Sequence, residues 1–290
     1  MTVSAETELE LGRWQVTEER VNQYLNAVGD HGQSYTQFGM APPLALSAWA
    51  LGSLLQRLSL PPGAIHSLQE LETHRGLQLG EEIVATARLN KPRRRGNMEF
   101  LTIGYTLKDQ AGQPVQQGKS TVLVIDPNTA TGEAGRPASA AANEGSHQEY
   151  HWQSPLKTIG QTQLIAYAQA SGDDNPLHLD ADFAAATQFG GIIAHGMLTL
   201  AFIGEIMAAA FGRAWLETGC LAARFKGAAY LGDKLQAWSR VAKGGSLAEG
   251  TAVECSVGVK NFQTGQDLVT GTASIKADTP GFFLENKGQG

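Results

Sequence analysis

Residues 171–178 read SGDDNPLH and join an apolar run to a segment with a helical pattern. The Asn175-Pro176 pair must leave ordinary helix geometry, because proline lacks an N–H and restricts the residue before it. One interpretation is a plain helix connection, since Asp, Asn and Pro are common at turns and helix starts. The other is that the bend brings Asp173 and His178 to one pocket wall. There, two groups of different intrinsic pKa suit acid–base chemistry.

The chain on either side of this stretch repeats itself. VNQYLNAVGD at 21–30 is echoed by LIAYAQASGD at 164–173, an offset of 143 residues. Each half is predicted to contain a short helix, a longer apolar helix and several strands. Residues 126–149 are rich in Ala, Gly, Ser and Pro and show no apolar period, which is typical of a linker. We therefore predict an N-terminal repeat over 1–125, a linker, and a C-terminal repeat over 150–290.

The offset between the repeats then grows by about nine residues. Three later pairs of segments follow in the same order at an offset of 152: 39–55 with 191–207, 77–89 with 229–241, and 107–124 with 259–276. The extra residues fall in the segment that carries the Asn-Pro. In the first half, the residue five positions after Asp30 is Tyr35, and no Asn-Pro is present. Because the Asp-His segment occurs only once, we assign it to chemistry rather than to folding, and expect no second site around Asp30 and His31.

A second histidine stands at the start of a long apolar helix, predicted over about 195–210. The helix is apolar on nearly every face, as expected for a buried central helix. Gly196 in its first turn lets a ligand approach the backbone closely. Free N–H groups and the helix dipole favour negative charge at this end. An acid–base pair beside such an N–H donor suits enolate chemistry next to a carbonyl.

These two blocks, GDDNPLHLD and GGIIAHGM, resemble the signature of the MaoC-like dehydratases, or (R)-specific enoyl-CoA hydratases (hydratase 2). Residues 171–178 fill every fixed position of the pattern Ser/Thr-Gly-Asp-x-Asn-Pro-Leu/Ile-His, and 195–197 match its His-Gly-Met helix start. RFKGAAYLGDKL at 224–235 resembles the strand and Gly-Asp turn that follow. The resemblance implies an α+β double hot-dog fold: two repeats of a curved antiparallel sheet wrapped around a long central helix. Single-repeat relatives form this pair as a homodimer, and the acyl-thioester tunnel would lie between the halves.

The resemblance also implies the reaction and the catalytic roles. Asp173 and His178 would hold and activate a water molecule, then exchange protons with C2 and C3 of a trans-2-enoyl-CoA to give a (3R)-3-hydroxyacyl-CoA. Asn175 would fix the dyad or the water, and the Gly196 N–H would polarise the thioester carbonyl. The choice of base and acid within the dyad stays open, because a coupled pair can share the task.

Four further residues are candidate substrate contacts. His195 and Met197 follow from the motif, whereas Arg224 and Lys226 flank the strand after the central helix and are expected near the tunnel mouth. KPRRRG at 91–96 is either a solvated hairpin turn or a clamp for the phosphates of coenzyme A. The other histidines, His66 among them, show no partner pattern and receive no role.

Composition narrows the class of protein. The chain has 290 residues, 42% of them hydrophobic, and a formal net charge of −6, which argues against generic nucleic-acid binding. Cys220 and Cys255 lack metal-type spacing and predict a reducing compartment. No signal-peptide pattern is present, and no apolar run reaches the ~20 residues that span a membrane. We expect a cytoplasmic enzyme with no metal and no cofactor beyond the coenzyme A of its acyl-CoA substrate, without membrane partners, as a monomeric double hot dog or a homodimer.

Three alternatives remain open at this point. The same fold could act on a branched or dicarboxylic enoyl-CoA such as a mesaconyl-CoA. LALSAWALGSLLQRL at 44–58 reads as a full helix, so the first half keeps its core, which favours short or medium acyl groups. A thioesterase would not need the Asp-x-Asn-Pro-x-His block. A non-catalytic acyl-CoA binding protein is disfavoured because that block is intact.

Overall fold

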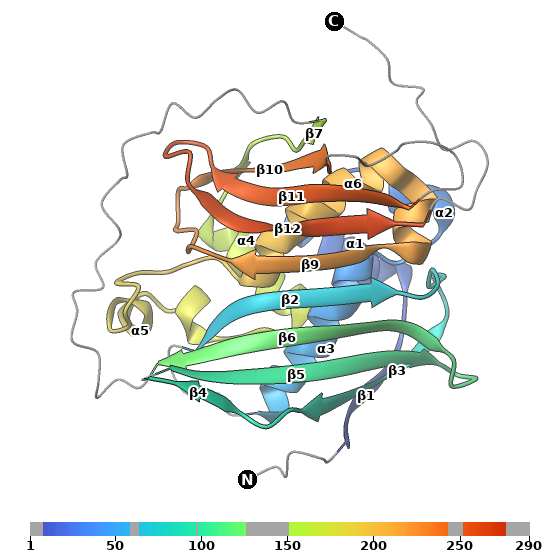
Figure 1. The fold of residues 1–290 in the computed structure, drawn as a ribbon, viewed down its shortest axis with the longest axis horizontal. Coiled ribbons are helices and arrows are strands. Elements are labelled where there is room, and N and C mark those ends of the chain that lie inside the picture. Colours follow the sequence, from blue (N-terminus) through green and yellow to red (C-terminus); the bar gives the residue numbers. More distant parts are fainter. Residues whose placement is uncertain (1–7, 59–63, 97, 126–150, 243–251, 277–290) are drawn as a thin grey trace, which may run out of the picture.

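The two halves of the chain build one continuous antiparallel sheet (Figure 1). The computed structural model describes residues 8–58, 64–96, 98–125, 151–242 and 252–276. The predicted linker at 126–149 lies outside these described residues. The described elements of the first half are β1 (Glu8–Gln15), α1 (Glu18–Val28), α2 (Ser34–Phe38), α3 (Pro43–Arg57), β2 (Ile65–Thr73), β3 (Glu82–Leu89), β4 (Arg93–Arg95), β5 (Met98–Asp109) and β6 (Pro114–Ile125).

The second half repeats this order and adds elements around the Asn-Pro segment. Its described elements are β7 (Trp152–Gln153), β8 (Lys157–Thr158), α4 (Gln161–Ser171), the 3₁₀ turn η2 (Pro176–His178), α5 (Ala181–Ala185), α6 (Gly196–Thr218), β9 (Cys220–Phe225), β10 (Lys234–Val241), β11 (Val253–Asn261) and β12 (Asp267–Ile275). The sheet order among the described strands is β1-β3-β5-β6-β2-β9-β12-β11-β10-β7, with β4 beside β5 and β8 beside β10. The strands of each half therefore stay together.

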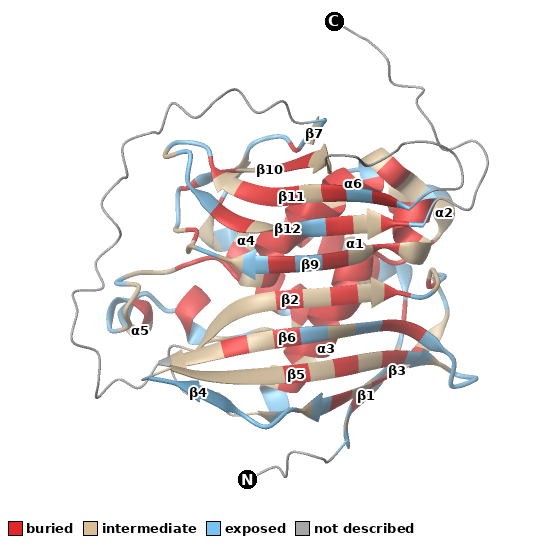
Figure 2. Ribbon diagram, viewed as in Figure 1, coloured by how far each residue is buried: buried red, intermediate tan, exposed pale blue. Residues whose placement is uncertain are grey.

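The half-sheets meet where β2 pairs with β9. This antiparallel ladder runs from Leu68 opposite Arg224 to Glu72 opposite Cys220. The long helices α3 and α6 lie on one face of the sheet, and their residues are mostly buried (Figure 2). The predicted double hot-dog fold is confirmed by this arrangement.

The two central helices touch at a glycine. A Cβ placed on Gly204 of α6 would lie 2.7 Å from Cδ1 of Leu44 on α3, so the helices approach too closely there for a larger residue. Helix α6 is longer than the sequence predicts and continues to Thr218 past a break at Gly212, where φ is 45°. By length and composition α6 is apolar enough to cross a membrane, but 72% of its most apolar window is buried inside the structure.

Candidate active site

The chain turns sharply between α4 and η2, and this turn places the two candidate acid–base residues. Gly172 ends α4 in the left-handed conformation, with φ of 81°, which glycine adopts at little steric cost. The Asp173 N–H then donates to the Ser171 hydroxyl at 3.2 Å. The Asn175 side chain accepts from a backbone N–H at 3.0 Å and caps η2. The 3₁₀ turn carries His178 inward, where only 8% of the residue is exposed.

The structure brings Asp173, His178 and His195 together. One carboxylate oxygen and one ring nitrogen from each histidine all lie within 4.8 Å of one another. The two imidazole rings overlap, with centroids 3.9 Å apart and planes inclined by 35°. The three side chains therefore form one compact polar cluster.

Backbone carbonyl groups fix the tautomers of both rings. The Nδ1 atom of His178 lies 2.8 Å from the Ile193 oxygen, and Nε2 of His195 lies 3.0 Å from the Asp173 oxygen. A ring nitrogen facing a carbonyl must carry the proton, because a carbonyl only accepts. In the neutral rings this leaves a lone pair on His178 Nε2 and on His195 Nδ1, which has no hydrogen-bond partner.

Burial shifts the dyad's pKa values toward one another. Desolvation is the main cause that raises the pKa of Asp173, and it lowers the pKa of His178. Each charge partly opposes this, since His178 lowers the Asp173 pKa and Asp173 raises that of His178. Burial, with a smaller effect of the neighbouring His178, holds the pKa of His195 well below its usual range. A pair with converging pKa values exchanges a proton at small cost, as general acid–base catalysis requires.

A cavity of about 330 Å³ lies against the dyad, between the two halves of the chain. Its lining is largely apolar. The first half supplies residues of α3 and of the adjacent strands, including Leu51, Leu55, His66, Val122 and Leu123. The second half supplies the residues with candidate chemistry. These are Asp173, Asn175, His178, Gly196, Met197, Thr199 and Lys226.

Two of the predicted substrate contacts do not line this cavity. His195 is completely buried and stacks behind His178, so it holds the dyad rather than the ligand. Arg224 is exposed, and side chains alternate along β9, where Ala223 is buried and Phe225 faces the cavity. Its side chain therefore points to the other face of the sheet. This corrects the expected position at the tunnel mouth.

The basic run at 91–96 forms an exposed hairpin beside β5. Its strand β4 is fully exposed, and Arg94 pairs with Glu99 at 3.4 Å. In the ladder, Arg93 lies opposite Phe100, which lies opposite the cavity residue Leu123. The hairpin thus stands two strands from the cavity wall, and its contact with coenzyme A phosphates stays a prediction.

Gly196 offers its backbone N–H at the start of α6. Within the described residues, no acceptor receives a hydrogen bond from this group. A Cβ on Gly196 would lie 3.0 Å from Phe225 Cε1 and 3.5 Å from His66 Nδ1. The site beside Gly196 is therefore narrow, and the helix dipole points its positive end into it.

His66 also faces the site, although the sequence pattern predicted no role for it. Its ring stacks on Phe225 with centroids 4.7 Å apart, and it lines the cavity from the first half. No motif marks this residue. Only the pairing of β2 with β9 brings His66 next to Gly196, and that pairing joins residues about 150 positions apart in the chain.

The buried His66 side chain is expected to make the stability of the fold depend on pH. Burial lowers its pKa from 6.5 to about 4, so between these values the unfolded chain binds a proton that the folded chain does not. Stability is thus lost as pH falls from about 6.5 toward 4, by up to about 3 kcal/mol for this residue. His66→Gln should flatten the decline by about one proton in urea unfolding measured across this range. His31→Gln is the matched control at an exposed position, and equal slopes for wild type and His66→Gln would contradict the assignment.

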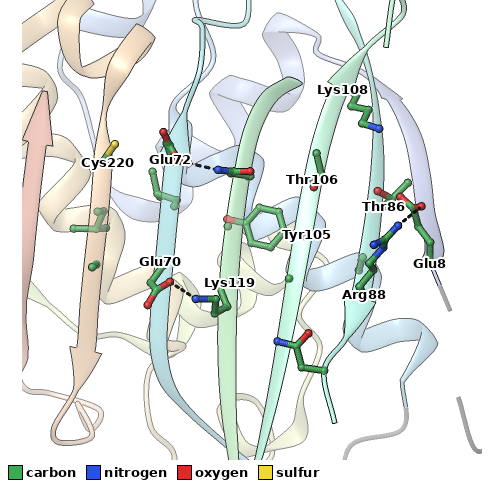
Figure 3. Close-up of a pocket in the computed structure, with 18 of the residues that line it drawn as sticks. Glu8, Glu70, Glu72, Thr86, Arg88, Tyr105, Thr106, Lys108, Lys119 and Cys220 are labelled. Atoms are coloured by element: carbon green, nitrogen blue, oxygen red, sulfur yellow. Dashed lines mark hydrogen bonds and ion pairs between the residues drawn. The ribbon is translucent and has the colours of Figure 1, made fainter. Parts of the chain in front are cut away.

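A broader hollow of about 760 Å³ lies on the sheet face turned away from the helices (Figure 3). Its charged side chains are largely paired with one another. Lys119 pairs with Glu70 at 2.8 Å, and Arg88 pairs with Glu8 at 3.3 Å. Residues with matched acid–base geometry are absent from its described lining, so the smaller cavity is the candidate active site.

The donor atoms of the dyad and His195 are also the one group in the described residues whose spacing suits a metal ion. An ion there would occupy the His178 lone pair that a proton needs. Acid–base chemistry without a metal stays a prediction.

Two family models match the two halves separately. The model described as MaoC like domain matches residues 142–261, and the model described as FAS1-like, dehydratase domain region matches residues 4–117. The Aeromonas caviae protein named (R)-specific enoyl-CoA hydratase is 32% identical over 121 residues, which cover 41% of this chain and 87% of that protein. The Methylorubrum extorquens 3-hydroxybutyryl-CoA dehydratase is 41% identical over 51 residues, or 18% of this chain and only 32% of its own length. Both names describe hydro-lyases.

Solved structures agree on the fold. A structure named MaoC-like dehydratase superposes with a TM-score of 0.72 at 19% identity, covering 93% of this chain and 97% of that one. A Mycobacterium tuberculosis protein described as having a double hot-dog fold gives 0.60 at 13% identity, covering 95% and 96%. At these identities the solved structures show the fold alone. The (R)-specific enoyl-CoA hydratase, in contrast, is matched in sequence over most of its length. On the match in sequence and on the MaoC like domain model, this chain belongs to the MaoC-like dehydratase family.

Proposed function

We propose that the chain catalyses the reversible hydration of a trans-2-enoyl-CoA to a (3R)-3-hydroxyacyl-CoA. One observation carries the proposal: Asp173 and His178 sit together on the wall of an apolar cavity, beside the Gly196 N–H at a helix start. The cavity suits an acyl chain, the pair suits proton transfer to and from water, and the N–H suits a thioester oxygen.

The chemistry follows from these positions. Water held by Asp173 and His178, with Asn175 beside them, adds through its oxygen to C3 of the enoyl thioester. One member of the dyad accepts a proton from the water, and the pair returns a proton to C2. Negative charge gathers on the thioester oxygen between these steps. The N–H of Gly196 and the dipole of α6 stabilise that charge more than they stabilise the neutral carbonyl.

The first half of the chain shapes the part of the cavity that would hold the acyl group. Leu51 and Leu55 of the intact helix α3 close the cavity, which supports short or medium acyl groups. Lys226 in the same lining favours a second candidate substrate, a branched or dicarboxylic enoyl-CoA such as a mesaconyl-CoA, because an ammonium group pairs with a carboxylate. Coenzyme A enters as part of the substrate, and we propose no separate cofactor and a reducing, cytoplasmic setting.

One assay tests the proposal. Crotonyl-CoA, longer enoyl-CoAs and mesaconyl-CoA are each mixed with the protein, and loss of the enoyl-thioester absorbance band is followed. Loss of the band without release of free thiol supports hydration. Release of thiol would instead identify a thioesterase, and an unchanged band with all substrates would remove the enzymatic proposal.

Gly52 on α3 is expected to be essential for the position of the turn between α4 and η2, which carries Asp173. A Cβ on this residue would lie 2.1 Å from the backbone oxygen of Ser171 and 3.0 Å from the Gly172 carbonyl carbon, so Gly52→Ala must push the entry to Asp173 aside. A displacement of about 1 Å costs roughly 10²-fold in rate, and overpacking costs about 1–3 kcal/mol of stability. Steady-state hydration kinetics and thermal unfolding measure both effects. Gly104→Ala is the matched control, because its Cβ would meet no atom closer than 4.0 Å; equal kinetics for the two variants would refute the contact's importance.

The first half is expected to hold no catalytic site of its own. Asp30 is buried and accepts a hydrogen bond from the Gly32 N–H at 2.8 Å, which an asparagine oxygen would also accept. His31 is exposed. Asp30→Asn and His31→Ala should therefore change kcat by less than about a few-fold. Loss of a positioned acid–base group would instead lower kcat by about 10²–10⁴-fold. Titration with a tight product analogue should count one site per chain, and two sites would contradict this.

A further inference from the structure

A hollow of about 450 Å³ lies on the far side of α3 from the active-site cavity. Helices α1, α3 and α4 and the strand β1 surround it. Its lining is mainly amides and hydroxyl groups, from Thr17, Gln23, Ser53, Gln56 and Gln169. Neutral hydrogen-bonding groups of this kind bind a polar ligand without dictating the sign of its charge. The sign of the charge that the hollow favours is set by Arg20, which is also part of its lining.

Arg20 is a half-buried cation whose neighbours are aromatic rings. Its guanidinium carbon lies 4.2 Å from the ring centroid of Trp49 and 5.3 Å from that of Trp14. Burial alone lowers the pKa of Arg20, with no carboxylate opposing it. Among the described residues, no ion pair or side-chain hydrogen bond engages this guanidinium. The cation–π contacts offset part of the desolvation, but the N–H donors of Arg20 have no acceptor in the described part of the chain.

Arg75 is a partly buried arginine for comparison, and its guanidinium pairs with carboxylates of the protein. Its side chain is 34% exposed, and it pairs with Glu81 at 2.8 Å and with Asp109 at 3.0 Å. These acceptors raise the pKa of Arg75, the reverse of the shift at Arg20. The one acid in the lining of the hollow is Glu19, which is exposed and contributes nothing to the Arg20 shift.

The inner wall of the hollow is the chain that enters the active site. Ser171 and Gly172 line it, directly before Asp173. The Gln56 amide donates to the Gly172 oxygen at 3.3 Å, and the Trp49 indole donates to the Ala170 oxygen at 3.0 Å. A ligand in the hollow would therefore lie against Gln56, which holds the end of α4.

We propose that this hollow binds a small oxyanion, a carboxylate or a phosphate, through Arg20. A planar guanidinium donates two parallel hydrogen bonds to either group, and the surrounding amides can donate to the remaining oxygens. The bound anion supplies the countercharge that the described residues do not give to Arg20. The site is separate from the acyl-CoA cavity, because α3 stands between them.

Calorimetric titration of the full chain tests this without any substrate. Sodium phosphate and sodium acetate are the two titrants, at constant ionic strength set with sodium chloride. Wild type should bind at least one of them saturably, with one site per chain, in titrations to about 10 mM. Arg20→Gln should weaken binding at least about tenfold, the loss expected for charge-assisted hydrogen bonds. Arg13→Gln, at an exposed arginine paired with Glu82 on the neighbouring strand, should bind as wild type does.

A second variant decides the matter if Arg20→Gln does not fold. Gln23→Glu places a carboxylate three residues from Arg20 on α1, where the two side chains are neighbours. It should neutralise the arginine internally and weaken anion binding about as strongly as Arg20→Gln. Absence of saturable binding by wild type, or binding that survives Gln23→Glu and any folded Arg20→Gln, would overturn the proposal. A failed hydration assay would leave these results standing.

Discussion

Asp173→Asn and His178→Asn should each give a folded protein that hydrates its substrate about 10²–10⁴-fold more slowly, or slower still. Asparagine at 173 keeps the side-chain shape but cannot ionise. Asparagine at 178 can still donate toward the Ile193 oxygen that now faces His178 Nδ1, but it offers no basic nitrogen to the cavity. Single-turnover kinetics with an active enoyl-CoA measure the loss, and near-ultraviolet circular dichroism reports the fold.

Asp174→Asn is the matched control for the dyad. Asp174 is exposed and adjacent to Asp173 in the chain, so the same chemical change there should leave kcat within a few-fold of wild type. A dyad variant that binds a product analogue but does not turn over argues against a purely binding role. Conversely, near wild-type kcat for Asp173→Asn or His178→Asn would remove that residue from the dyad.

Gly196→Ala should lower kcat/KM by about 10²–10³-fold while thermal stability stays near wild type. The added methyl group fills the space in which the thioester oxygen must approach the N–H, and loss of one such donor typically has this effect. Its Cβ would meet the edge of the Phe225 ring at 3.0 and 3.2 Å, a side chain that can shift by a few tenths of an ångström. Alanine also favours a helix over glycine by about 1 kcal/mol, which offsets the crowding.

Leu44→Ala is the partner experiment in the first half, at the position aligned with Gly196. Leu44 is 2% exposed and packs on Gly204, so its truncation should lower the free energy of unfolding by about 2–5 kcal/mol. Activity per folded molecule should persist. If Leu44→Ala abolishes turnover and Gly196→Ala only unfolds the protein, then the site has been assigned to the wrong half of the chain.

The sequence predicted those parts of the site that are close together along the chain. Asp173, Asn175 and His178 belong to one turn, whose geometry Gly172 and Pro176 largely dictate, and local rules of that kind can be read directly. The repeat offset marked the same segment as an addition to an otherwise shared fold. The internal repeat and the motif were therefore enough to predict the double hot dog.

The sequence could not predict the role of residues that depends on which strands pair or on which face of the sheet a side chain lies. His66 reaches the site only because β2 lies beside β9, and no local pattern states which strands become neighbours. Arg224 was expected at the tunnel mouth, but side chains alternate along a strand, and a difference of one residue decides the face. His195 carries the motif yet sits behind His178, because a helix start fixes its backbone and leaves the depth of its ring to packing.

The junction of β2 with β9 also affects how this protein can change over generations. In a homodimer of single repeats, one gene codes for both walls of the cavity. A substitution that reshapes the acyl wall therefore appears in both subunits, including the one that supplies the catalytic turn. Here the walls are coded separately, and the hydrogen-bonded seam keeps them in register whatever their side chains become. Substitutions at Leu51, Leu55 and His66 can therefore change the acyl wall of the cavity without altering the sequence of the Asp-His turn. In a chain that carries both halves, the wall that recognises the acyl group can change while the wall that does the chemistry stays the same.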